Sequence, residues 1–335
     1  MKKMVITLAT ALPLSAGAQP VYPTIGKLIS VDPAFNTLVA PDARIEVIAS
    51  GFVWAEGPVW VKEGGYLLFS DVPKNTIYRW TEQEGLSVFL HPSGYTGLGR
   101  YSDEPGSNGL TIDPQGRLIA CEHGDRRVSA LPLDRPGGKQ TLADNFGGKR
   151  FNSPNDVVAL SDGSYFFTDP PYGLPEGQFD VSNRELDVCG VYRIAPPQPD
   201  GSRPVTRVVS DLQRPNGVAL SPDEKTLYVA QSSDEAVLMA YDIRPGGSLA
   251  NGRVFFDGRP LLKQGLTGHF DGLKTDRRGN VWSTGPGGLV VLSPQGKLLG
   301  RIELGVATAN CAWGDDGTTL YITADMYVCR LRTGR

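Results

Sequence analysis

The chain has 335 residues and a formal net charge of -3 at pH 7, with 33 basic and 36 acidic residues interspersed along it. This balance offers no basic face for nucleic acid, and no segment beyond the extreme N-terminus approaches the ~20 consecutive apolar residues of a membrane-spanning helix. The 41 glycines and 26 prolines supply many turns, and no long amphipathic helical pattern is present, so the composition indicates an all-β fold.

The first 18 residues have the pattern of a secretory signal peptide. Lys2-Lys3 precede an apolar run, and Ala16-Gly17-Ala18 supplies the small residues of a cleavage site. We expect cleavage after Ala18 and a periplasmic or secreted protein; the alternative is a cytoplasmic protein with a disordered tail. Disulfides form in exported proteins, so Cys311 and Cys329 in the last repeat are either a disulfide or two isolated core thiols.

The next segment, residues 19–43, contains prolines and shows no regular pattern, which predicts an irregular arm on the surface. Residues 44–50 then form a run rich in β-formers. This run matches the strands that precede later repeats, at residues 86–90, 206–210, 254–257 and 299–303. It therefore predicts a strand of the kind that ends a repeat, although no repeat precedes it in the sequence.

A short β unit recurs six times from there on, and its clearest copy is residues 214–230. Each copy opens on one polar residue, here called the lead residue, and continues with an apolar run, a turn rich in Asp and Gly, and a second strand. The lead residues are Glu56, Asn108, Asn155, Asn216, Asp271 and Asn310. Their spacing of 39 to 61 residues predicts a six-bladed β-propeller that occupies residues 44–335 as one domain.

Two insertions interrupt the regular spacing, at residues 92–107 and 170–188, and both contain Gly, Pro and Tyr. Long loops in a regular domain are often functional, so both are candidate lids. The last repeat ends at Arg335 without an outer strand. We expect the strand at residues 44–50 to complete it and so to close the ring.

The first strand of each blade of a propeller runs along the central channel, so the six lead residues should form a ring of oxygen-bearing side chains. Such a ring without Cys or His suits Ca²⁺, and Mg²⁺ less well. The alternative is that Asn-Gly only marks a turn at the start of a strand. That alternative does not explain Glu56 and Asp271, whose buried carboxylates need a cation or hydrogen-bond partners.

Several motifs around the lead residues resemble the senescence marker protein, gluconolactonase and luciferin-regenerating enzyme family of six-bladed propellers. They are Glu56-Gly-Pro-Val-Trp60, Ser153-Pro-Asn-Asp156, Arg214-Pro-Asn-Gly217 and Phe270-Asp-Gly-Leu273. Cys121-Glu-His-Gly124 and Phe167-Thr-Asp-Pro-Pro-Tyr-Gly173 resemble the bacterial gluconolactonase branch. The resemblance covers nearly all of the chain after the signal peptide.

The resemblance implies a hydrolase that opens sugar lactones and holds one divalent cation, usually calcium, with Mg²⁺, Zn²⁺ and Mn²⁺ as alternatives. It implies Glu56, Asn155, Asn216 and Asp271 as cation ligands, with Asp271 also the acid/base. Ser153 stands where the family has a substrate-binding arginine, so substrate contacts are expected to differ.

Further candidates for substrate binding are Asn108, Asn155, His123 and Tyr172, with Asn310 as channel lining. His123 and His269 are candidates to assist the reaction, and Tyr95 and Tyr101 are, with Tyr172, candidates to line a polyol pocket. Two other functions stay open: an organophosphate or phosphoester hydrolase on the same cation, and a binding module without catalysis. The expected partner is a small lactone, with neither nucleic acid nor membrane, and the protein is expected to be a monomer or a small homo-oligomer.

Overall fold

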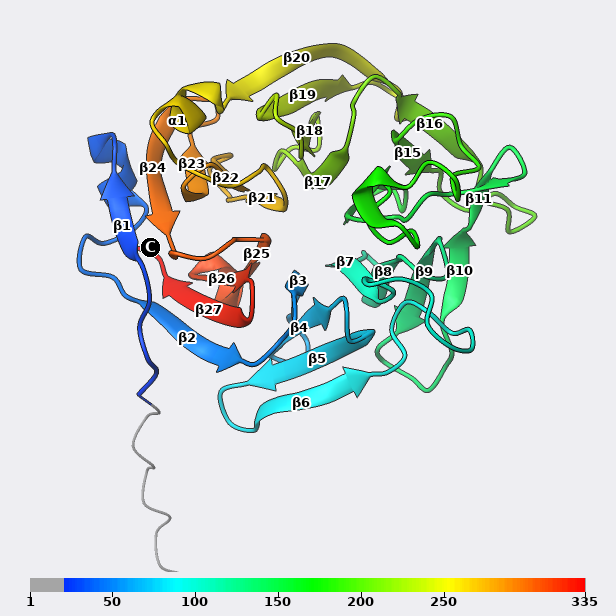
Figure 1. Ribbon diagram of the computed structural model, residues 1–335, viewed down its shortest axis with the longest axis horizontal. Coiled ribbons are helices and arrows are strands. Elements are labelled where there is room, and N and C mark those ends of the chain that lie inside the picture. The colour runs from blue at the N-terminus through cyan, green and yellow to red at the C-terminus, as the bar shows by residue number, and fades with distance from the viewer. Residues whose placement is uncertain (1–20, 335) are drawn as a thin grey trace, which may run out of the picture.

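The computed structural model describes residues 21–334, which form six antiparallel sheets arranged as blades around a central channel (Figure 1). The predicted six-bladed β-propeller is therefore confirmed. The predicted signal peptide at residues 1–18 lies outside the described residues. No helix within residues 21–334 has both the length and the apolar character needed to cross a membrane.

The blades follow one another along the chain, and in each of them the first strand lies nearest the channel. Blades 1 to 3 consist of β3 (Ala55–Val61), β4 (Tyr66–Asp71), β5 (Thr76–Thr81) and β6 (Gly85–Leu90); β7 (Ser107–Ile112), β8 (Arg117–Glu122), β9 (Arg127–Pro132) and β10 (Gln140–Ala143); and β13 (Val157–Ala159), β14 (Tyr165–Asp169), β15 (Gly190–Ile194) and β16 (Val205–Val209). Blades 4 to 6 consist of β17 (Pro215–Leu220), β18 (Thr226–Gln231), β19 (Val237–Ile243) and β20 (Leu249–Asp257); β21 (Leu273–Thr275), β22 (Val281–Gly285), β23 (Gly288–Leu292) and β24 (Leu298–Glu303); and β25 (Asn310–Gly314), β26 (Thr319–Ala324), β27 (Tyr327–Arg332) and β2 (Ile45–Ser50).

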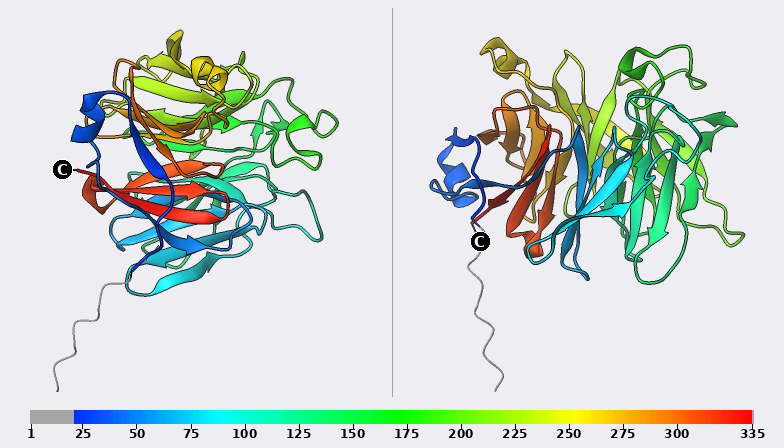
Figure 2. Two further views of the ribbon diagram at one scale, coloured as in Figure 1. Left: turned by 60° about the vertical axis from the view of Figure 1, so that its left-hand side comes forward. Right: turned by 60° about the horizontal axis from the view of Figure 1, so that its bottom comes forward.

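A few short elements connect or flank the blades. They are the hairpin β11 (Asn145–Phe146) and β12 (Lys149–Arg150), the turns of 3-10 helix η2 (Gly177–Phe179) and η3 (Asp315–Gly317), and the helix α1 (Arg259–Lys263). Figure 2 shows the green segment that contains η2 and the yellow helix α1 rising from the same face of the ring.

The core lies between the blades. The second strands β14 and β22 are buried along their whole length, because each blade packs a face against both neighbours. The outer strand β6, in contrast, exposes Ser87 and Val88 to solvent. Six apolar clusters are present among the described residues, one between each pair of adjacent blades. The ring is thus held together by side-chain packing between sheets.

The N-terminal arm is more regular than its sequence suggests. β1 (Lys27–Ser30) pairs with β24 as a fifth strand of blade 5, and the 3-10 helix η1 (Pro33–Thr37) follows it. The expectation of an irregular arm is wrong for these two elements. A four-residue strand is too short to show a pattern, and the open edge of blade 5 supplies the hydrogen-bond partners that stabilise it.

Phe35 in η1 anchors this arm. Its side chain is 1% exposed and lies in the cluster between blades 5 and 6, with its ring against Gly300 of β24. We expect Phe35→Ala to lower the free energy of unfolding by about 3–5 kcal/mol, because no neighbouring side chain at Gly300 fills the space. Denaturant unfolding measures this loss. Phe179→Ala, at a ring that is 77% exposed, is the control and should change stability by less than ~0.5 kcal/mol; equal losses in the two variants would contradict the anchoring role.

The two ends of the chain meet in blade 6. β2 pairs antiparallel with β27, from Ile45 opposite Leu331 to Ser50 opposite Tyr327. The backbone N–H of Gly334 donates to the carbonyl oxygen of Leu38 at 2.9 Å, so the C-terminal residues also contact the arm. Figure 2 shows the blue N-terminal strand lying alongside the red strands of the C-terminus.

The order of the strands in blade 6 shows that Cys311 and Cys329 do not form a disulfide. Cys311 lies on β25 and Cys329 on β27, and both face Ile322 of the strand between them. Two strand spacings separate the cysteines by about 10 Å, beyond the reach of a disulfide. All four cysteines, at residues 121, 189, 311 and 329, are buried free thiols.

Candidate active site

The lead residues gather at one end of the channel because the inner strands of all six blades start there. Glu56, Asn108 and Asn216 are the second residues of β3, β7 and β17, and Asn310 is the first residue of β25. Asn155 and Asp271 stand two residues before β13 and β21. Every lead residue except Asp271, which is partly buried, is at most 5% exposed.

The glycine after a lead residue is required by close packing around the channel. A Cβ on Gly109 would contact the backbone oxygen of Asn155, and a Cβ on Gly217 would overlap the backbone oxygen of Asp271. Each glycine thus lets the next blade's lead residue approach. Neither has a positive φ, so the interpretation of Asn-Gly as a left-handed turn is wrong at these positions.

The starts of three inner strands are also bulged. The register of β3 with β4 shifts between Glu56 and Val59, and equivalent shifts occur between Ser107 and Leu110 and between Pro215 and Val218. A bulge turns the side chain at its start away from the regular alternation of the strand. In these three blades it coincides with the lead residue, whose polar group faces the channel mouth.

A cavity of about 380 Å³ lies at this end of the channel. Seven of the predicted candidates line it: Glu56, Asn108, Asn155, Tyr172, Asn216, His269 and Asp271. Four are not among the lining residues: Tyr95, Tyr101, His123 and Asn310. Tyr95 and Tyr101 stack on each other instead, with ring centroids 5.1 Å apart.

Two further lining residues, Trp54 and Arg214, were not predicted as part of the site. Trp54, Arg214 and His269 each stand two residues before a lead residue, so their side chains lie on the same side of the chain and form a second tier above the ring. Only His269 was named beforehand. The offset of two from Glu56, Asn216 and Asp271 is a sequence signal that would have found the other two.

Both insertions reach the cavity. Asp103 and Glu104 come from the first, and Tyr172, Gly177 and Gln178 from the second. The Gln178 side chain accepts a hydrogen bond of 2.7 Å from the Arg214 guanidinium, which holds that arginine toward the second insertion. Tyr172 has a pKa raised to about 12, mainly by burial, so its hydroxyl stays protonated at neutral pH.

Ser153 does not replace the family arginine as a cavity residue. It is fully buried, and its hydroxyl donates to the Pro170 carbonyl oxygen at 2.6 Å and accepts from the Gly173 N–H at 3.0 Å. It therefore clamps both ends of the short segment that carries Tyr172. Where the family has an arginine side chain, this chain therefore has a buried serine that holds Tyr172 in the cavity.

The acidic side chains of the cavity repel one another. Burial, followed by the charges of Glu56, Asp156 and Glu104, raises the pKa of Asp271 well above its usual range. Burial and the charge of Asp156 likewise raise the pKa of Glu56, against a hydrogen bond from the Gly57 N–H. Glu104 has its pKa raised to about 7 by burial and by Asp103. Such crowding of buried carboxyl groups is typical of functional sites and of cation sites.

Below Glu56 a polar network fills the channel. The Asn310 amide donates to the Glu56 carboxylate at 3.3 Å, and its oxygen accepts from Lys274 at 3.4 Å. The ammonium group of Lys274 lies 3.8 Å from the Asp156 carboxylate, which also accepts from the Val218 N–H at 3.2 Å. Asn310 thus supports the site from beneath, and Lys274 neutralises Asp156 inside the channel.

His123 lies behind the cavity wall. It is fully buried, its Nδ1 is 3.1 Å from the Glu104 carbonyl oxygen, and its Nε2 has no hydrogen-bond partner among the described residues. Burial lowers its pKa to about 4, so the ring is neutral at neutral pH. Its contact with the backbone of Glu104 connects it to the cavity only indirectly.

The donors at the cavity floor fit a hard cation. Glu56 and Asp271 supply carboxylates and Asn155 and Asn216 supply side-chain amides, all of them facing one cavity. Oxygen donors of this kind are those preferred by Ca²⁺. Within residues 21–334, no cluster of three or more His, Cys, Asp or Glu side chains is placed to hold a metal ion, so the amide oxygens are essential members of this set.

The cavity at the lead residues adjoins a further cavity. A second cavity of about 650 Å³ shares Trp54, Ser232, His269 and Asp271 with the first and extends along residues 303–308. A molecule with its reacting group at Asp271 thus has room to extend beyond the channel mouth.

Comparison with known proteins places this site in a family. The profile of the SMP-30/gluconolactonase/LRE-like region matches residues 54–325, a segment that contains all six lead residues and both insertions. The chain belongs to this family. It is 40% identical to a gluconolactonase of Zymomonas mobilis over 320 residues, which cover 92% of this chain and 87% of the relative.

Solved structures agree with this membership in the SMP-30/gluconolactonase family. A gluconolactonase from Xanthomonas campestris is 32% identical with a TM-score of 0.79, and the match covers 94% of this chain and 98% of that one. A putative gluconolactonase is 34% identical with a TM-score of 0.78, over 92% and 98% of the two chains. β1 and β2 lie outside the family segment, and the lead residues lie within it.

Proposed function

We propose that this protein is a hydrolase that opens sugar lactones and uses one divalent cation, calcium in the first place. The observation that carries the proposal is the meeting of Glu56, Asn155, Asn216 and Asp271 at the floor of one cavity. The gluconolactonase relatives support lactones as the substrate class. When bound, the cation supplies a Lewis acid that polarises the lactone carbonyl.

Asp271 is the proposed acid/base. As a carboxylate it accepts a proton from a water molecule that attacks the carbonyl carbon, and it then returns this proton to the ring oxygen as the bond between carbonyl carbon and ring oxygen breaks. The products are a free hydroxyl and a carboxylic acid, which ionises in water.

The second tier and the insertions are proposed to bind the substrate hydroxyls. Arg214 and the Tyr172 hydroxyl supply hydrogen-bond donors on the side of the second insertion, and Asn108 supplies an amide on the side of the first. Trp54 offers a flat apolar face at the mouth. This arrangement recognises a polyol ring from above while its carbonyl points to the floor.

The experiment measures hydrolysis of a panel of aldonolactones and one phosphotriester, with calcium and after exhaustive chelation. We expect lactone hydrolysis that chelation abolishes and added calcium restores, and calorimetry should show one calcium ion per chain. A lactonase rate unchanged by chelation would contradict the cation. Faster hydrolysis of the phosphotriester than of any lactone would contradict the substrate class.

We also propose that the protein is exported, on the basis of Lys2-Lys3, the following apolar run and Ala16-Gly17-Ala18. Mass spectrometry of the natively expressed protein should find Gln19 as its first residue. An intact Met1 on cytoplasmic protein would show that no export occurs.

A further inference from the structure

A third, separate cavity lies at the opposite end of the channel strands. Its volume is about 640 Å³, and none of its lining residues belongs to either of the two cavities at the active site. β3 begins near Glu56 and ends beside Trp60 and Lys62, and β25 begins at Asn310 and ends beside Trp313. The strands that carry the candidate active site at their starts therefore carry this cavity at their ends.

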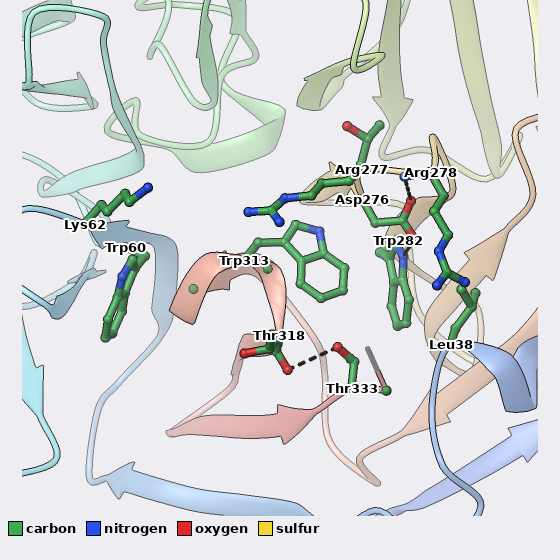
Figure 3. A pocket seen from close by; sticks show the side chains of 14 residues that line it. Leu38, Trp60, Lys62, Asp276, Arg277, Arg278, Trp282, Trp313, Thr318 and Thr333 are labelled. Atoms are coloured by element: carbon green, nitrogen blue, oxygen red, sulfur yellow. Dashed lines mark hydrogen bonds between the residues drawn. The ribbon is translucent and has the colours of Figure 1, made fainter.

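The wall of the cavity is aromatic. Figure 3 shows the indole rings of Trp60, Trp313 and Trp282 in a row across it. Tyr321 stacks on one face of Trp60 at 5.4 Å between centroids, which leaves the other face for the cavity. Trp313 packs edge-on against Trp282 at 5.1 Å and so is held in place. Flat, fixed indole faces are suited to the apolar face of a sugar ring.

One polar group in this wall has no partner. The indole nitrogen of Trp313 is buried and makes no hydrogen bond among the described residues. The neighbouring indole nitrogen of Trp282, in contrast, donates to the Asp276 carboxylate at 3.1 Å. An unpaired buried N–H is unfavourable, and a hydroxyl or an anionic oxygen of a ligand would satisfy it.

The charge around the rings is positive. Lys62, Arg277 and Arg278 line the cavity, and Figure 3 shows Arg277 reaching toward Lys62 while Arg278 lies on the side of Trp282. Among the described residues neither guanidinium group makes an ion pair or a hydrogen bond, although the backbone N–H of Arg278 donates to the Asp276 carboxylate at 2.9 Å. The carboxylate of Asp276 forms no ion pair with either guanidinium group; it accepts from the indole of Trp282 at 3.1 Å and from the Asn280 side chain at 2.7 Å.

We propose that this cavity binds an anionic carbohydrate, a sugar acid or a sugar phosphate. The ring of the ligand packs on the indoles of Trp60 and Trp313, and its anionic group lies at the guanidinium group of Arg277, with Arg278 adding positive charge on the side of Trp282. The planar geometry of a guanidinium group suits carboxylate and phosphate alike. The site lies at the far end of the channel from Asp271. Its occupancy therefore does not depend on hydrolysis or on a cation at the other end.

Calorimetry on the whole protein in the presence of a chelator tests this, because the chelator removes any binding that depends on a cation at the active site. The probes are gluconate, glucose 6-phosphate, neutral glucose and inorganic phosphate. We expect one gluconate or glucose 6-phosphate per chain, with glucose and inorganic phosphate at least about tenfold weaker. Preference for gluconate identifies a carboxylate ligand, and preference for glucose 6-phosphate a phosphate ligand; either supports the proposal.

Two variants and one control variant locate the site. Arg277→Ala/Arg278→Ala should weaken binding by about tenfold or more, since hydrogen bonds to charged groups are lost. Arg135→Ala/Arg244→Ala removes the same charge from exposed positions elsewhere and should leave the affinity unchanged. Trp313→Phe keeps a ring but removes the N–H, and should also weaken binding. The proposal is overturned if neither anion binds, if glucose or inorganic phosphate binds as tightly as the sugar anions, or if Arg277→Ala/Arg278→Ala retains full affinity.

Discussion

Asp271→Asn is expected to lower the kcat of lactone hydrolysis by a factor on the order of 10²–10⁴, the usual contribution of a general base. Asparagine has nearly the same size and keeps one oxygen toward the cavity floor, so the cation should still bind. The physical reason is that the carboxylate of Asp271 is the group placed to accept the proton, while Glu56, Asn155 and Asn216 remain as oxygen donors. The measurements are kcat at saturating calcium and calcium affinity by calorimetry.

Asp234→Asn is the control for this variant. Asp234 is an exposed carboxylate in the turn after β18, two residues from the lining residue Ser232, and removing its charge should change neither quantity. Full lactonase activity in Asp271→Asn would eliminate Asp271 as the acid/base. A collapse of both activity and calcium affinity would instead make Asp271 a ligand without a role in proton transfer.

Glu56→Gln is expected to lower calcium affinity and to leave most of the turnover at saturating calcium. Oε2 of Glu56 accepts from the Gly57 N–H at 2.8 Å and from the Asn310 amide at 3.3 Å, and an amide oxygen in its place keeps both hydrogen bonds. The loss of one negative charge should weaken cation binding by about tenfold or more. Excess calcium should then restore most of the turnover, which it cannot do for Asp271→Asn; absence of rescue would place Glu56 in the chemistry.

The sequence could predict the fold because the lead residue and its following strand pair recur six times. It could predict the floor of the site for the same reason: equivalent positions of a propeller meet at the channel. The role of the glycines at 109 and 217 could not be predicted, since the sequence pattern Asn-Gly does not distinguish a left-handed turn from a close approach between neighbouring blades. These close approaches bring Gly109 to Asn155 and Gly217 to Asp271, and the partners of each pair lie in different repeats of the sequence.

Other parts of the site depend on partners that no local pattern reveals. Ser153 is a clamp because Pro170 and Gly173 come back to it from the second insertion. Asp156 and Lys274 form the channel network because the inner ends of blades 3 and 5, two positions apart in the ring, meet inside the channel. Arg214 and Trp54, in contrast, could have been predicted. Side chains two residues apart in an extended chain point to the same side, and each of these residues stands two positions before a lead residue.

Loss of β2 is expected to have the largest effect on stability. A chain that begins at Gly51 lacks the outer strand of blade 6 and exposes the side of β27 that pairs with it. It also loses Ile45 and Ile48, which are 3% and 7% exposed, and the 2.7 Å ion pair between Glu46 and the buried Arg330. Two buried isoleucines account for about 4–10 kcal/mol, a loss comparable with the ~5–15 kcal/mol by which a whole domain is stable.

Three truncated chains distinguish the contribution of β2 to stability from that of the N-terminal arm. They are compared by thermal unfolding and size-exclusion chromatography. A chain from Val21 keeps β1, η1 and β2 and should unfold as the full-length chain does. A chain from Arg44 loses β1 and η1, and with them Phe35, and should be destabilised by about 3–5 kcal/mol while remaining folded. The chain from Gly51 should be unfolded or aggregated at 25 °C, since the unpaired edge of β27 is also a template for pairing with other chains. If it melts together with the chain from Arg44, pairing of β2 with β27 does not hold the ring closed, and the packing between blades alone is sufficient.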